Sequence, residues 1–172
     1  MEWAKGYSQT EIDDAQVRYG LVFPPDLAAL LRERRPAKGY DWNKEDTRIR
    51  GMLAWPLDSL LRDVEHGLWW PDWGERPRDP SERAEVVRHA VSRASRLIPL
   101  FAHRFLPETP HEAGNPVFSV WGFDTIYYGA DLAEYFENEF SGRHVVGRVR
   151  HIPFWSDLER ADDFPRAVPD GH

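Results

Sequence analysis

Apolar residues in the first part of the chain recur at the spacing of an α-helix. Ser8 and Glu11 have the spacing of a capping box, in which each side chain bonds the backbone of the other residue, and they predict a helix over about 9–19. A stripe of leucines at positions i, i+3 and i+4 predicts a second helix over about 25–35. Pro36 is expected to end that helix, because the residue before a proline is pushed out of the helical conformation.

The middle of the chain is less regular and predicts two further helices between irregular segments. In chain order we expect a polar loop over 36–50, a short strand over 51–55, a helix over 57–67, an ordered aromatic loop over 68–74 and a helix over about 79–96. Pro56 separates the expected strand from the helix that follows it. Acids in the first turn of the last helix and arginines toward its end suit the helix dipole.

After residue 96 the pattern changes to alternation and short apolar runs, which are typical of strands. Strands are expected over 97–101, 104–106, 117–121 and 124–128, followed by a helix over about 131–142. Because helices come first and strands cluster later, the predicted fold class is α+β, with a mostly antiparallel or mixed sheet and about five helices. We expect one domain over 1–160 and a flexible acidic tail over 161–172, within a proline-bearing stretch that starts at Ser156.

Composition narrows the classes of protein. The chain has 172 residues, 41% of them apolar, and no cysteine, so disulfides and thiolate chemistry are excluded and a reducing compartment is favoured. The sequence shows neither the layout of a signal peptide nor an apolar run of membrane-spanning length, so we expect a cytoplasmic location. The net charge of -7 disfavours nucleic acid as a partner and indicates either a basic partner or simple solubility.

Several segments together resemble the SUKH superfamily of Smi/Knr-type proteins. They are the opening helix pair over 11–31, the run Leu97–Phe101, the hairpin from Gly114 through Gly129, the helix start at Asp131 and the aromatic segment Trp69–Gly74, which resembles a bacterial branch. The resemblance implies a mixed sheet flanked by helices and no known catalysis. It also implies a protein-binding role, because many bacterial members are immunity proteins that neutralise a toxin, often a nuclease, while some eukaryotic relatives are regulatory scaffolds.

Catalytic and metal chemistry find little support in the residues. His103, His111 and Glu112 lie close in sequence, but their spacing matches no metal motif with a mechanism, and we expect them to cap turns or line a cleft. Asp124 is placed at a turn, where aspartate is favoured by hydrogen bonds to its own backbone. We therefore expect no catalytic residue, no metal and no cofactor; an enzyme that uses the two histidines and Glu112 is the alternative.

Acidic residues gather in the helix expected over 131–142. Asp131, Glu134, Glu137 and Glu139 have no basic residue among them, and the apolar residues of that helix take its buried face. Most of these carboxylates are therefore expected to point to water. They form either a solvated face, with Asp131 at the helix N-terminus, or a patch that steers a basic toxin.

The aromatic residues suggest a second element of a binding surface. Trp69, Trp70 and Trp73 fall within seven residues, and either two of them cover the core or they serve as interface anchors. Trp121 and Tyr128 could extend such a surface. We expect a protein that binds a partner stoichiometrically through Trp69, Trp70, Trp73, Trp121, Asp124, Tyr128, Asp131, Glu134 and Glu137. The alternative is a small-ligand or regulatory domain that uses a cleft lined by tryptophan.

Overall fold

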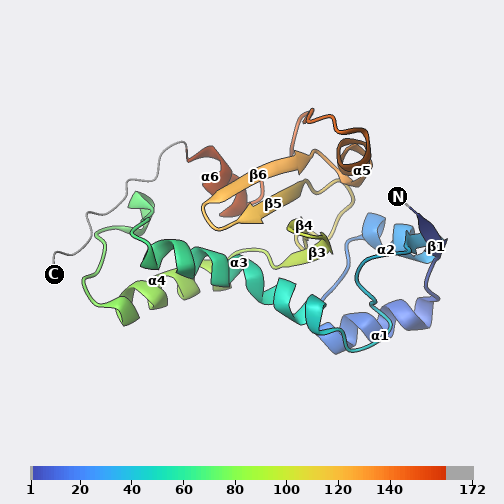
Figure 1. The fold of residues 1–172 in the computed structure, drawn as a ribbon, viewed down its shortest axis with the longest axis horizontal. Helices are drawn as coiled ribbons and strands as arrows, with labels where there is room; N and C mark the ends of the chain where they lie inside the picture. Colours follow the sequence, from blue (N-terminus) through green and yellow to red (C-terminus); the bar gives the residue numbers. More distant parts are fainter. Residues whose placement is uncertain (1, 162–172) are drawn as a thin grey trace.

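The computed structural model describes residues 2–161 as a chain of alternating helical and extended elements (Figure 1). In chain order these are β1 (Trp3–Lys5), α1 (Gln9–Tyr19), α2 (Pro25–Glu33), β2 (Arg34–Pro36), α3 (Thr47–Glu65), the 3-10 turn η1 (Pro71–Trp73), α4 (Pro80–Arg93), β3 (Leu97–Phe101), β4 (Arg104–Pro107), β5 (Val117–Trp121), β6 (Asp124–Gly129), α5 (Leu132–Ser141) and α6 (Trp155–Arg160). Two antiparallel sheets, β1-β2 and β3-β4-β5-β6, complete the fold. The predicted α+β class is therefore confirmed.

Helix α1 begins and ends where local signals predict. Helix α2 begins at Pro25 as expected but ends at Glu33, before the expected end near Arg35, because Arg34–Pro36 pairs with β1. Ser8 Oγ accepts a hydrogen bond from the Glu11 N–H at 3.1 Å, and the Glu11 carboxylate accepts one from the Ser8 N–H at 2.9 Å. Gly20 ends α1 with a φ of 63°, a conformation that glycine adopts without strain. Pro25 begins α2, and the chain then extends directly into β2, whose pairing with β1 was not predicted.

Helix α3 is longer than the sequence predicted and replaces two of the expected segments. Its N-cap is Asp46, so the helix begins inside the loop expected over 36–50, and the strand expected over 51–55 is wrong. Buried side chains recur at helical spacing on both sides of Pro56, which lies buried inside the helix. Packing of that face offsets the roughly 3 kcal/mol that an interior proline costs a helix.

Alternation along the main sheet sends neighbouring side chains to two different hydrophobic clusters. The first cluster takes Ile98, Leu106 and Val117 from the strands, together with apolar residues of α1, α2 and α5. The second takes Leu97, Phe105, Phe118 and Val120, together with apolar residues of α3, α4 and α6. The four predicted strands are all present. Their side chains alternate between two buried faces, and this alternation is the pattern from which the strands were predicted.

The last helix of the described chain was not predicted. It is α6, which lies within the expected domain over 1–160 and in which Ser156 and Leu158 are buried. Apart from Ala161, the expected tail over 161–172 lies outside the described residues. Within residues 2–161, the helices fall short of the length and apolar character needed to cross a membrane.

Candidate functional site

The aromatic segment between α3 and α4 is mostly built into the second cluster. Trp69 and Trp70 are 5% and 7% exposed, and Trp73 is half-buried. The Trp69 indole N–H donates to the Gly74 carbonyl at 2.9 Å, which satisfies the polar end of a buried ring. The expected use of Trp69 and Trp70 as surface anchors is therefore corrected, since two of the three indoles cover the core.

A hollow nevertheless remains beside this segment. It has a volume of about 320 Å³, and its lining includes Trp70, Trp73 and Phe154 with the polar side chains Arg93 and Asp157. The rings of Trp70 and Phe154 meet edge to face with their centroids 5.6 Å apart. Small-molecule pockets are typically ~300–1,000 Å³, so the hollow is at the lower limit of that range.

An exposed aromatic cluster lies at the turn of the β5–β6 hairpin. Trp121 is 49% exposed, and its ring contacts those of Trp55 and His103 at centroid distances of 4.9 and 4.4 Å. The Trp55 indole N–H donates to the Val120 carbonyl at 2.8 Å, which fixes the supporting ring. Burial and the nearby Arg104 lower the pKa of His103, which favours the neutral imidazole in this cluster.

The hairpin turn that carries Trp121 is fixed to α3. The Asp63 carboxylate accepts a hydrogen bond from the Phe123 N–H at 2.8 Å. Gly122 has a φ of 59°, and a Cβ there would lie 2.0 Å from Asp63 Oδ2. Asp124 lies directly opposite Trp121 in the antiparallel pair and is exposed. The predicted residues Trp121 and Asp124 are thus neighbours on one firmly held surface.

Most carboxylates of the acidic helix α5 and its N-cap form hydrogen bonds or ion pairs within the protein. Asp131 caps the helix by accepting the Glu134 N–H at 2.9 Å. The Glu134 carboxylate accepts hydrogen bonds from the N–H groups of Ala130 and Gly147, so it ties down the chain after the helix. The expectation that most of these carboxylates point to water is therefore wrong for Glu134. Glu137 is exposed as predicted.

A second acid of α5 forms an ion pair with a strand of the main sheet. Glu139 forms an ion pair with Arg104 at 3.0 Å, with side-chain exposures of 15% and 18%. Arg104 also donates to Ser119 Oγ at 2.9 Å and lies over the Tyr128 ring, 3.7 Å from its centroid. Tyr128 is half-buried, and its ring also contacts His144. Tyr128 is therefore less available to a partner than its position in the strand suggested.

Two of the predicted acids, Asp131 and Glu137, line a groove between α2 and α5. The groove has a volume of about 800 Å³, and Leu30, Leu132 and Phe136 form its apolar floor. The sequence alone gave no sign of it, because residues about one hundred positions apart form its two walls.

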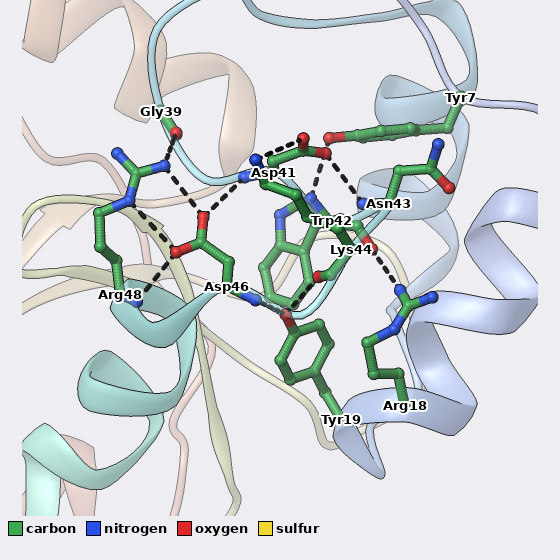
Figure 2. Close-up of polar contacts among 10 residues, drawn as sticks. All are labelled: Tyr7, Arg18, Tyr19, Gly39, Asp41, Trp42, Asn43, Lys44, Asp46 and Arg48. Atoms are coloured by element: carbon green, nitrogen blue, oxygen red, sulfur yellow. Dashed lines mark hydrogen bonds and ion pairs between the residues drawn. The ribbon is translucent and has the colours of Figure 1, made fainter.

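A polar network that the sequence did not predict holds the segment before α3 (Figure 2). The Tyr19 hydroxyl donates to the Lys44 carbonyl at 2.7 Å and accepts from the Asp46 N–H at 2.8 Å. The Tyr7 hydroxyl accepts from the Trp42 N–H at 3.1 Å. These bonds satisfy backbone polar groups of the loop before α3, so the network holds that loop in place.

Asp46 is the buried acid of this network. Its carboxylate accepts hydrogen bonds from the N–H groups of Arg48 and Asp41, at 2.9 and 3.2 Å, and forms an ion pair with the Arg48 guanidinium at 2.9 Å. Hydrogen bonding from the Arg48 guanidinium is the main reason that the pKa of Asp46 is lowered to about 2. Asp46 is therefore an anion throughout the physiological range.

The residues considered for metal binding do not meet. His103 precedes β4, whereas His111 and Glu112 follow its other end, and Glu112 forms an ion pair with Arg150 at 3.3 Å. Within the described part of the chain, no three histidine, cysteine, aspartate or glutamate side chains are placed to hold a metal ion.

Comparison with protein-family models, with curated proteins and with solved structures returned no match. What the fold and these surfaces define is an α+β protein with an exposed tryptophan cluster and an acid-lined groove. The resemblance to the SUKH superfamily stays a prediction.

Proposed function

We propose that this protein is a non-catalytic, cytoplasmic domain that binds a protein partner stoichiometrically. The observation that carries the proposal is the exposed ring of Trp121, supported by Trp55 and His103 on a hairpin that Asp63 fixes. A large aromatic side chain held in one orientation loses little conformational entropy on binding, which is why tryptophan is enriched among interface anchors. Asp124 beside it would add a polar contact at the rim.

The role that we favour is immunity, in which the domain covers the active surface of a toxin, with a basic nuclease as the preferred partner. The motif order that resembles the SUKH superfamily supports this role, and so does the net charge of -7, because opposite charge raises the rate of encounter with a basic partner. A complex of this kind would bury roughly 1,200–2,000 Å² in total.

The test is to express candidate toxins encoded by the genes adjacent to this one, each with and without the chain, and to measure survival. Trp121→Ala should weaken the purified complex by about 2 kcal/mol, or roughly thirtyfold in Kd, and should reduce protection. Val22→Ala is the control, because Val22 is also about half exposed but is not one of the residues that form the aromatic cluster around Trp121. Unchanged toxicity in the presence of the wild-type chain would refute the immunity role.

The hollow beside Trp70 and Trp73 favours a second candidate function, a small-ligand-binding or regulatory domain. Its aromatic walls and the polar side chains Arg93 and Asp157 are typical of a site that orients a small molecule. A thermal-shift screen of metabolites separates the two functions. A rise in Tm that grows with metabolite concentration and disappears in Trp73→Ala would favour the ligand site.

A further inference from the structure

We propose that the groove between α2 and α5 binds a basic, amphipathic segment of the partner protein, with one apolar side chain in the groove and arginine or lysine side chains at its rim. This inference rests on the proposed function and deepens it by naming the chemistry of the partner. The two faces are separate, because Trp121 lies at one end of the β5–β6 hairpin and the groove lies beyond the other end, where Gly129 leads into α5.

The floor of the groove has the form of an apolar docking site. Leu30, Leu132 and Phe136 supply its hydrophobic surface, and the small side chains Ala29 and Ala133 are exposed along the two walls. Small wall residues allow another backbone to approach closely. The Phe136 ring packs against the rings of Trp3 and Tyr135, with centroid distances of 5.4 and 4.8 Å. An apolar side chain could therefore be buried here against a firm surface.

Charge decides which kind of segment the groove accepts. Among the described residues that line it, four are acids and one is a base; the acids are Asp26, Glu33, Asp131 and Glu137, and the base is Arg34. The Arg34 guanidinium lies over the Trp3 ring, 4.4 Å from its centroid. An acidic segment would be repelled along most of the groove, whereas a basic one would meet a carboxylate on both walls.

Two of the four acids are fixed in place by the backbone. Asp26 accepts the N–H groups of Gly114 and Leu27, each at 3.0 Å, and Asp131 accepts that of Glu134 at 2.9 Å. These bonds orient the carboxylates but leave acceptor capacity for an arginine or lysine donor.

The exposed acids Glu33 and Glu137 lie on opposite walls and complete the rim. The shorter wall, α2, has 9 residues. At 1.5 Å per residue it is about 13 Å long, which matches about four residues of an extended segment.

The probe for the test is a short fluorescein-labelled peptide in which arginine and leucine alternate, and binding is measured by fluorescence anisotropy. The double variant Glu33→Gln with Glu137→Gln should weaken binding by about tenfold or more at about 0.02 M salt, and the difference should shrink at about 0.15 M salt. The control Glu65→Gln with Glu75→Gln changes two exposed acids elsewhere and the same net charge, and it should bind as the wild type does.

Two further peptides and one variant test the apolar part. A peptide with glutamate in place of arginine, and one with serine in place of leucine, should each bind at least about tenfold more weakly than the arginine–leucine peptide. Ala133→Phe fills the groove from an exposed position without changing charge and should also block binding. Circular dichroism of each variant checks that the fold is retained.

The outcomes separate this inference from the proposed function. Equal loss in the Glu65→Gln/Glu75→Gln control, equal binding of the glutamate peptide, or no binding by the wild type would each overturn the groove proposal. If those results occurred while Trp121→Ala still reduced protection against the toxin, partner binding would stand and the groove alone would be wrong. If the peptide bound as expected but the toxin were unaffected, the groove would stand and the immunity role would fail.

Discussion

Replacing Asp46 by alanine should destabilise the fold by a few kilocalories per mole, although the residue lies in no candidate binding surface. The substitution removes the N-cap of α3 and the hydrogen bond from the Asp41 N–H, each worth about 1 kcal/mol. It also removes the ion pair with Arg48, worth at most about 1 kcal/mol because Arg48 is 62% exposed and solvent screens the pair. We expect the free energy of unfolding to fall by about 2–3 kcal/mol near neutral pH.

The same carboxylate makes part of the stability depend on pH. Hydrogen bonding from the Arg48 guanidinium is the main cause that lowers the pKa of Asp46 from 3.8 to about 2 in the folded state. The folded protein therefore binds this proton less readily than the unfolded chain does. The stabilisation is therefore fully present above about pH 4 and is lost as the pH falls through 2. After allowance for the exposed Arg48, the loss is about 1–2 kcal/mol.

Urea denaturation followed by tryptophan fluorescence measures both effects. Asp46→Asn is the informative second variant, because asparagine retains the cap but has no charge to titrate. Between about pH 5 and pH 3 the wild type should lose more stability than Asp46→Asn does, and the difference between the two removes the contribution of every other acid. The reasoning is refuted if both proteins lose the same stability over that range, or if Asp46→Ala costs less than about 0.5 kcal/mol near neutral pH.

Three further predictions concern the chain after α5, the aromatic residues and the hairpin turn. Glu134→Ala should speed hydrogen exchange at Gly147 about tenfold or more, because that amide loses its acceptor. Trp69→Ala should lower the free energy of unfolding in urea by about 3–5 kcal/mol, whereas Trp121→Ala should lower it by less than about 1 kcal/mol, and similar losses would contradict the assigned burial. Gly122→Ala should lower the Tm by several degrees in a calorimetric scan. The φ of Gly122 is positive, and a Cβ there would clash with the Asp63 carboxylate that fixes the turn. An unchanged Tm would contradict this prediction.

Local signals in the sequence predicted the elements that depend on neighbours in the chain. The capping box at Ser8 and Glu11 and the alternation in the four strands gave correct helices and strands, because each reports a nearby hydrogen bond or a buried face. The region around Pro56 failed, because a proline usually marks a boundary and only burial against the rest of the fold keeps it inside α3. The helix α6 was missed because an acidic, proline-bearing composition hid the short buried face at Trp155 and Leu158.

The surfaces were harder to predict than the elements. Trp121, Asp124 and Glu137 were correctly expected to be exposed. In contrast, the partners of Glu134 and Glu139 are an amide 13 residues later and an arginine 35 residues earlier, and no local pattern records such pairs. The groove between α2 and α5 depends on the same long-range placement, so it could be found only once the chain was folded.

The main sheet sits between the two hydrophobic clusters, and this arrangement has a consequence for how the molecule comes apart. Each strand contributes side chains to both clusters, as Phe105 and Leu106 do on successive positions of β4. Loss of either cluster would expose one side of the strands to water. It would also destabilise the other cluster, because the same strands form part of both. The molecule should therefore melt in a single step, and a cut between α2 and α3 should leave two fragments that are insoluble apart and regain structure only when mixed.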